Sequence, residues 1–146
     1  MLKIIVDSRE QQLLWTNDII VKKLDVGDYS IEGHEHSFAI ERKGLPDLFS
    51  TLGKGNRRFK RELERAKSYS YFAIIIEGTY TQVEDKFFPG AEYSQMKGDV
   101  VNKILNTLMV KYGIHVIYAQ NREEARKMVI GLMEAYLRVH TKLYIE

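Results

Sequence analysis

Three charged residues early in the chain, Asp28, Glu41 and Lys43, have the types and spacing that metal-dependent cleavage of a phosphodiester bond requires. Side chains alternate between the two faces of a strand, so Glu41 and Lys43 point the same way, about 7 Å apart. Phe38 and Ile40 then point to the opposite face, toward the expected core. A Glu-x-Lys pair alone is more often a solvated strand end. A second carboxylate close to this pair would favour a catalytic site over a solvated strand end.

A hairpin before this strand supplies that carboxylate. Residues 33–36 begin with glycine and are typical of a tight turn between two strands. If the turn is centred on its middle peptide bond, Tyr29 pairs with Ile40. Asp28 then falls opposite Glu41, and like charges that face each other across two strands repel. A divalent cation between them would remove this repulsion.

The ligand atoms predict the kind of cation. Carboxylate oxygens that leave room for waters and a phosphate oxygen suit Mg²⁺ or Mn²⁺ better than Zn²⁺. Lys43 beside them would orient the attacking water, help to deprotonate it, or stabilise the charge that develops on the phosphate. We therefore expect Mg²⁺ or Mn²⁺ as the cofactor, with one or two ions as open alternatives.

The residues around this trio resemble one known family along nearly the whole chain. The matching segments are Val6-Asp7-Ser8-Arg9-Glu10, Gly27-Asp28-Tyr29, Ile40-Glu41-Arg42-Lys43 with Asp47, Arg58-Phe59 with Glu62-Leu63, and Ile74-Ile75-Ile76-Glu77-Gly78. In this order they resemble the nuclease domain of the XPF family, which includes the archaeal Hef nuclease. The resemblance implies a restriction-endonuclease-like, PD-(D/E)xK fold and Mg²⁺-dependent cleavage of DNA near flaps, forks and splayed arms. It also links the chain to DNA repair or recombination, with replication and a viral cycle as open alternatives.

The resemblance assigns metal ligands by position. Asp28 and Glu41 resemble the ligands of the family, and Lys43 resembles its catalytic lysine. The backbone carbonyl of Arg42 would complete the metal shell. Asp7, at the end of the first strand, would be a further ligand, directly or through a water.

The same resemblance implies supporting roles for the neighbouring charged residues. Glu10 and Asp47 would orient the catalytic groups, and the loss of such groups usually reduces activity without abolishing the fold. Arg9 and Arg42 would hold a phosphate. The catalytic set expected from the sequence is therefore Asp7, Glu10, Asp28, Glu41, Lys43 and Asp47.

A basic segment follows the catalytic strand. Residues 54–67 contain seven Lys and Arg against two Glu, a local charge of +5 compared with +2 for the whole chain. Arg57, Arg58 and Arg61 are the residues that we expect to follow DNA phosphates, which gives salt-sensitive affinity with little sequence preference. The alternative is a solvated helix face held by its own ion pairs.

The pattern of apolar residues predicts the elements that position these groups. We expect strands at 2–6, 19–26, 29–32, 37–43, 72–77 and 114–119. Helices are expected from Pro46, over 56–68, over 94–112 and over 121–138, with a long irregular loop at 79–93 and residues 11–17 as a helical turn or a loop. A mixed central sheet flanked by helices follows, as one α/β nuclease domain over residues 1–146.

Two apolar features have alternative interpretations. Phe87, Phe88 and Tyr93 would stack on unpaired bases or, more commonly, pin the loop to the core. Broad apolar stripes on the two C-terminal helices would cover the sheet or also leave a surface for a two-fold homodimer, which the resemblance favours.

Composition and length exclude several other classes. The chain has no cysteine, which excludes disulfides and thiolate zinc sites. It has no apolar run of membrane-spanning length and no signal-like start, so we expect an intracellular protein that does not enter membranes. We expect the 146 residues to leave no room for the helix-hairpin-helix module of cellular relatives. Selectivity for the DNA structure would then be looser, or a partner or a second subunit would supply it. A non-catalytic module that binds branched DNA and an unrelated α/β enzyme remain as alternatives.

Overall fold

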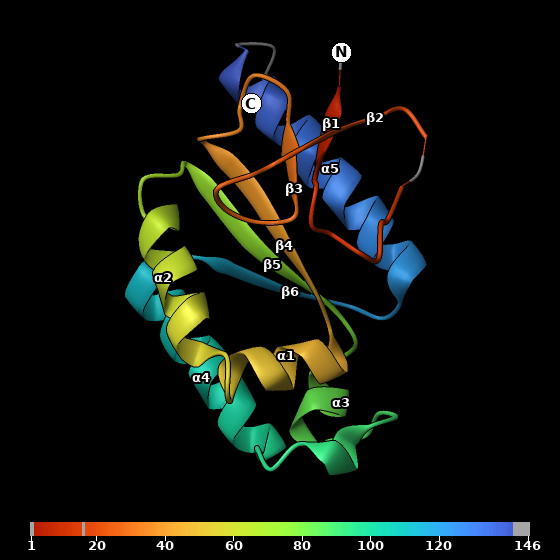
Figure 1. Ribbon diagram of the computed structural model, residues 1–146, viewed down its shortest axis with the longest axis vertical. Helices are drawn as coiled ribbons and strands as arrows, with labels where there is room; N and C mark the ends of the chain where they lie inside the picture. The colour runs from red at the N-terminus through yellow and green to blue at the C-terminus, as the bar shows by residue number, and fades with distance from the viewer. Residues whose placement is uncertain (1, 16, 142–146) are drawn as a thin grey trace.

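The computed structural model describes residues 2–15 and 17–141. Within them, six strands form one sheet in the order β2-β1-β3-β4-β5-β6, as Figure 1 shows. The strands are β1 (Ile4–Asp7), β2 (Ile19–Lys22), β3 (Tyr29–Ile31), β4 (Phe38–Gly44), β5 (Tyr71–Glu77) and β6 (His115–Ala119). The helices are α1 (Leu45–Leu52), α2 (Asn56–Ala66), α3 (Tyr80–Glu84), α4 (Gly98–Tyr112) and α5 (Arg122–His140), with a 3-10 turn at Ala91–Tyr93.

The sheet is mixed, as expected. β1 pairs with β2 in parallel and with β3 in antiparallel orientation, and β3 and β4 form the antiparallel hairpin. β4, β5 and β6 are parallel to one another. β5 therefore lies inside the sheet, one strand from the edge, where its run of apolar side chains is buried on both faces.

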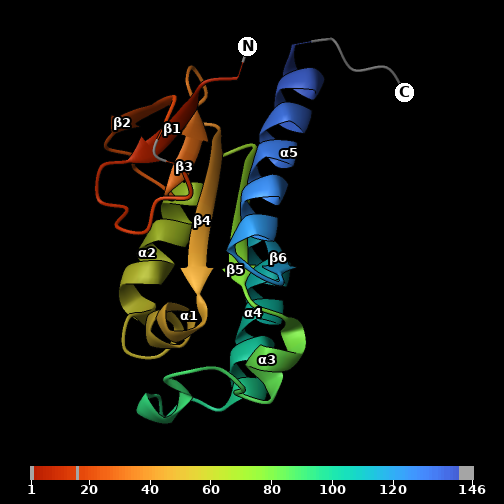
Figure 2. The same cartoon turned by 90° about the vertical axis from the view of Figure 1, so that its right-hand side faces the viewer.

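Helices cover both faces of the sheet (Figure 2). On one face, α1, α2 and α4 pack on a core that includes Ala39 and Ile74. On the other, α5 packs on a core that includes Ile40 and Ile75. Adjacent strand residues thus reach opposite cores, which is the alternation that the sequence predicts. None of the helices described between residues 2 and 141 has the length and apolar character needed to cross a bilayer.

Three expected boundaries are wrong. β2 ends at Lys22 instead of residue 26, because the chain turns inward there and the N–H of Leu24 donates to the Asp7 carboxylate at 2.7 Å. The loop expected at 79–93 contains α3, which begins with a reciprocal capping box between Thr79 and Gln82. α4 begins at residue 98 instead of 94. Gly98 lies so close to α3 that a Cβ atom would be 2.0 Å from the carbonyl oxygen of Val83.

Other expected signals are confirmed. Pro46 lies in the first turn of α1, and α4 ends at Gly113, which has a left-handed φ of 66°. Asn121 caps α5 by accepting a hydrogen bond from the Glu124 N–H at 2.8 Å. Residues 11–15 and 17 form a loop in the described chain.

The apolar stripes of α4 and α5 are mostly used inside the molecule. Val101, Leu105 and Leu108 of α4 are buried, as are Val129 and Met133 of α5. Exposed apolar side chains remain on both helices, among them Val100, Val110 and Val139. The expected homodimer stays a prediction.

Candidate active site

The β3–β4 hairpin brings the two central carboxylates together in the expected register. Tyr29 pairs with Ile40, and the N–H of Asp28 donates to the Ile40 carbonyl oxygen at 2.8 Å. Oδ2 of Asp28 accepts a hydrogen bond from the Arg42 N–H, also at 2.8 Å. The Asp28 carboxylate is therefore fixed against the backbone that follows Glu41.

Gly27 explains why a glycine precedes this aspartate. Its φ is 78°, and a Cβ atom would be 2.9 Å from the carbonyl oxygen of Ile40. Only glycine accepts this combination of a left-handed backbone and a close approach without strain. The Gly27 N–H also donates to Oε2 of Glu62 on α2 at 2.9 Å. The turn that presents Asp28 is thus held by both β4 and α2.

Glu41 and Lys43 lie on one face of β4, as expected, and are in direct contact. The Lys43 Nζ atom is 3.0 Å from Oε2 of Glu41, and only 7% of Glu41 is exposed. The ammonium group also lies 5.9 Å from the ring centre of Phe59 on α2. The interpretation of this segment as a solvated strand end is therefore wrong.

The two acids are unusual because Glu41 is buried and Asp28 half-buried, each beside other negative groups. Burial and then the charge of Glu10 raise the pKa of Asp28 to about 7, despite the Arg42 N–H and Lys43, which lower it. Burial, Asp28 and Glu62 raise the pKa of Glu41 well above its ordinary value. Burial alone would lower the pKa of Lys43, but Glu41 raises it overall. Negative charge is thus concentrated here beyond what one lysine offsets.

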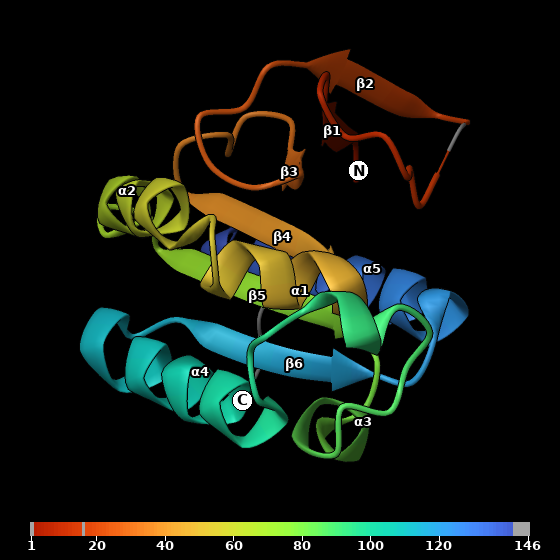
Figure 3. The same ribbon diagram turned by 60° about the horizontal axis from the view of Figure 1, so that its bottom comes forward.

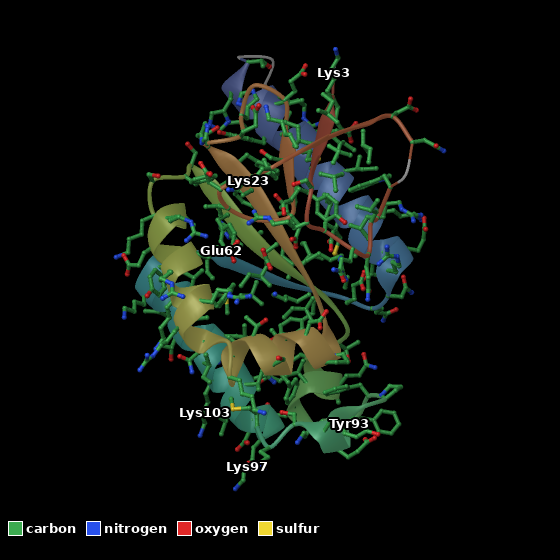
Figure 4. The ribbon with its side chains drawn as sticks, in the orientation of Figure 1. Lys3, Lys23, Glu62, Tyr93, Lys97 and Lys103 are labelled. Atoms are coloured by element: carbon green, nitrogen blue, oxygen red, sulfur yellow. The ribbon has the colours of Figure 1, made fainter. Side chains whose placement is uncertain are left out.

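Glu62 is the site residue that sequence reasoning missed. It comes from α2 and faces the hairpin, as Figure 4 shows, where it holds Gly27 and raises the pKa of Glu41. In the sequence it lies within a segment that resembles the family and adds a negative charge to the basic helix, but it had no expected role in the site. Its position between the buried residues Phe59 and Leu63 was the available signal, because a residue beside the apolar stripe lies at the edge of the core.

Asp7 and Arg9 form a tight structural unit at the end of β1. Arg9 binds the Asp7 carboxylate through its backbone N–H, its Nε at 3.0 Å and its Nη2. The N–H of Leu24 donates to the second Asp7 oxygen. Both Asp7 oxygens are occupied by hydrogen bonds, so a contribution through a water would disturb them less than direct ligation. Arg9 remains largely exposed at its outer edge.

Arg42 contradicts one expectation. Its side chain is 4% exposed and forms ion pairs with Glu10 at 2.9 Å and Glu77 at 3.1 Å. Glu77 also pairs with Arg122 at the start of α5. The guanidinium group is therefore enclosed by carboxylates and is not free to hold a phosphate. Glu10, in contrast, has the orienting position that was expected, since it also accepts a hydrogen bond from Tyr29.

A cleft opens beside Glu41 and Lys43 with a volume of about 600 Å³. Its wall is basic and is formed from the end of α1 and from α2, with side chains of Lys54, Arg57, Arg58 and Arg61. The interpretation of this helix as a solvated face is incomplete, because its basic side chains line a concave surface together with Glu41 and Glu62. Asp47 is exposed in the first turn of α1 and does not line this cleft.

The donor set fits a magnesium-type ion better than a structural metal site. Within residues 2–15 and 17–141, no group of three or more His, Cys, Asp or Glu side chains is gathered closely enough to enclose a metal ion. The half-buried Asp28 and the buried Glu41 nevertheless form a pair of like charges. Mg²⁺ commonly binds through one or two carboxylates while keeping waters and substrate phosphates as its other ligands.

The metal-free protein is expected to lose stability as pH rises from about 4 to 7 and to change little above that. The raised pKa of Asp28 means that the folded state binds its proton more tightly than the unfolded chain, so deprotonation favours unfolding. Denaturant midpoints in EDTA at several pH values would measure the slope. Asp28→Asn should flatten it. A wild-type stability that rises over this range, or an unchanged slope in the variant, would contradict the assignment.

Comparison with known proteins agrees with this architecture. XPF from Aeropyrum pernix matches with a TM-score of 0.72 and 21% identity over 97% of this chain and 68% of that chain. A structure of Aeropyrum pernix XPF in complex with DNA matches with a TM-score of 0.66 and 23% identity over 100% of this chain and 68% of that one. The shared fold is restriction-endonuclease-like.

Sequence comparison leads to the same family. A Methanocaldococcus jannaschii protein that carries the name ATP-dependent RNA helicase MJ1505 is 28% identical over 137 residues, or 91% of this chain. The chain spans only 15% of that relative's length. The family model of the ERCC4 domain matches residues 6–132. Such a match supports a role in DNA cleavage or DNA binding. The chain therefore belongs to the ERCC4 domain family, the family of XPF-type nuclease domains.

Proposed function

We propose that this domain is a Mg²⁺-dependent endonuclease that cuts DNA near branch points such as flaps, forks and splayed arms. The observation that carries the proposal is the pairing of Asp28 with the buried Glu41 across the hairpin, with Lys43 in contact with Glu41 and a basic cleft beside Glu41 and Lys43. Family membership supports the nuclease part. The branch preference rests on the resemblance to XPF-type domains.

Asp28, Glu41 and the backbone carbonyl of Arg42 are the proposed metal ligands. Asp7 would contribute through a water, because both of its oxygens already accept hydrogen bonds. A bound Mg²⁺ (or Mn²⁺) would polarise the scissile phosphate and lower the pKa of the attacking water. The charge of the ion would also offset the repulsion that raises the pKa of both carboxyl groups.

Lys43 is the proposed catalytic cation. Because Glu41 raises its pKa, the ammonium group keeps its proton near neutral pH. Of the roles considered from the sequence, stabilising the charge on the phosphate and orienting the water fit a protonated lysine, whereas abstracting a proton does not. Glu41 would thus position Lys43 as well as the metal.

The remaining charged residues have supporting roles in this proposal. Arg57, Arg58 and Arg61 would hold phosphates along the cleft, with Arg9 at its outer edge. Glu10 would fix Arg42 and so the strand that carries Glu41. Asp47 would act only once DNA is bound, since it is exposed and outside the cleft. A two-fold homodimer through α4 and α5 would supply a second DNA-binding surface.

A cleavage panel tests the proposal. End-labelled flaps, forks, splayed arms and linear duplexes are incubated with the protein in Mg²⁺, Mn²⁺ or EDTA. We expect metal-dependent cuts near the branch, none in EDTA, and a loss of roughly 10²–10³-fold for Lys43→Met. Tight binding of branched DNA without any metal-dependent cleavage would instead support the non-catalytic module.

A further inference from the structure

A second pocket, of about 660 Å³, lies next to the proposed catalytic cleft. It opens between α1 and the segment that joins α3 to α4, which run side by side in Figure 3. Its apolar floor is formed by Phe49, Phe88 and Met96. The ring centres of the two phenylalanines are 5.0 Å apart, and the ring planes are tilted by 51°. Its volume is within the range of roughly 300–1,000 Å³ that is usual for small-ligand sites.

The pocket is continuous with the cleft. Ser50 and Lys54 line both of them, and Lys54 is exposed on the basic wall. A ligand that follows the cleft toward the pocket therefore passes one cationic side chain and then meets an apolar floor. A cation at the entrance and an apolar floor behind it complement a nucleotide, whose phosphate would lie at the entrance and whose flat base would lie on the floor.

Tyr93 forms the outer wall of the pocket. Its side chain is 88% exposed and lies at the edge of the molecule, as Figure 4 shows. Its position is set by the backbone, since Gly90 turns the chain with a φ of 90° and Lys86 Nζ donates to the Ser94 carbonyl oxygen. The loop is thus held in shape while the Tyr93 ring stays free to stack. Phe88, by contrast, pins the loop to the core, as one of the two interpretations from the sequence expected.

We propose that this pocket binds an unpaired base of a single-stranded DNA arm, with Tyr93 as the stacking group and Lys54 at the adjacent phosphate. The proposal deepens the proposed nuclease function and rests on it, because it identifies the single-stranded side of the branch as the ligand. Aromatic side chains stack on any base, so the pocket selects single strands over duplex without reading sequence.

Binding without metal tests the pocket separately from cleavage. Fluorescence anisotropy in EDTA compares a labelled twelve-nucleotide oligothymidylate, an abasic strand of the same length and a duplex. The intact protein should bind the oligothymidylate about tenfold more tightly than the abasic strand. Tyr93→Ala should remove this difference. Phe87→Ala is the matched control, because Phe87 is 77% exposed in the same segment but does not line the pocket, and it should bind as the intact protein does.

Lys54→Ala separates the two parts of the proposed ligand. This substitution should lower the affinity for the oligothymidylate and for the abasic strand by a similar factor, and leave the preference for the strand with bases intact. Equal affinity of the intact protein for both strands, or a Tyr93→Ala variant that keeps the preference, would overturn the proposal. It would also be overturned if sedimentation showed that the pocket holds two copies together and that Tyr93→Ala separates them. Absence of cleavage in Mg²⁺ alongside a normal base preference would refute the nuclease function alone.

Discussion

Asp28→Asn is expected to abolish cleavage and, in the same protein, to raise the stability of the metal-free fold. The loss of activity should be on the order of 10³-fold, because the amide cannot supply the negative charge that a Mg²⁺ ligand needs. The fold should survive, since the carbonyl oxygen of Asn can still accept the hydrogen bond from the Arg42 N–H. Loss of activity together with a gain in stability is expected of a catalytic residue, whereas substitution of a core residue would lower stability.

The stability gain follows from the electrostatics of the site. Burial and the charge of Glu10 raise the pKa of Asp28 to about 7, so its ionised form opposes folding at pH 8. Removing that charge should increase the free energy of unfolding in EDTA by up to roughly 4 kcal/mol at pH 8. The gain should shrink toward pH 5.5, where wild-type Asp28 is protonated in the folded state.

Metal binding provides a readout that does not depend on cleavage. Mg²⁺ or Mn²⁺ should raise the thermal midpoint of the wild-type protein by mass action and leave that of Asp28→Asn nearly unchanged. Asp25→Asn is the matched control, since Asp25 is an exposed acid three residues earlier in the same loop. It should keep both activity and the metal-induced shift. Cleavage by Asp28→Asn at a wild-type rate, or a destabilised variant, would contradict the assignment.

The relative positions of Asp28, Glu41 and Lys43 could be predicted because they depend on local geometry. Strand alternation places Glu41 and Lys43 on one face, and the hairpin turn places Asp28 opposite Glu41. The structure has both features, in the predicted register. The same reasoning located β5 and the caps of α4 and α5, since each depends on residues a few positions apart.

The missed features depend on contacts between distant segments. Glu62 is 35 positions from the Gly27 N–H that it accepts, and Arg42 meets Glu77 across the same separation. A motif shows that Arg42 and Glu10 matter, but only packing shows that they neutralise each other. Packing also determines where α4 begins, because Gly98 marks its closest approach to α3. Strand alternation and sequence motifs therefore predict which side chains of the candidate site lie together better than they predict what holds those side chains in place.

Arg42→Met should be the most destabilising substitution in this region. Arg42 lies between Glu10 and Glu77, and both carboxylates are mostly buried. Removing one partner of a buried ion pair leaves uncompensated charge, which typically costs about 3–5 kcal/mol. We expect the lower end of that range, because Arg122 still pairs with Glu77 and Tyr29 still donates to Glu10. Urea unfolding in EDTA at pH 7 would measure the loss.

The effect of Glu10→Gln on stability should change sign between the wild-type and Arg42→Met backgrounds, which distinguishes an ion-pair network from ordinary packing. Glu10→Gln should destabilise the wild-type protein, because Arg42 loses a charged partner at 2.9 Å. In the Arg42→Met background the same change should restore stability, because it removes the carboxylate that was left unpaired. Lys67→Met is the control for a solvated ion pair, since Lys67 and Glu64 are both largely exposed, and it should leave the free energy of unfolding almost unchanged. If Glu10→Gln destabilised both backgrounds equally, Arg42 would act through its bulk, and its ion pair with Glu10 would not be what stabilises this region.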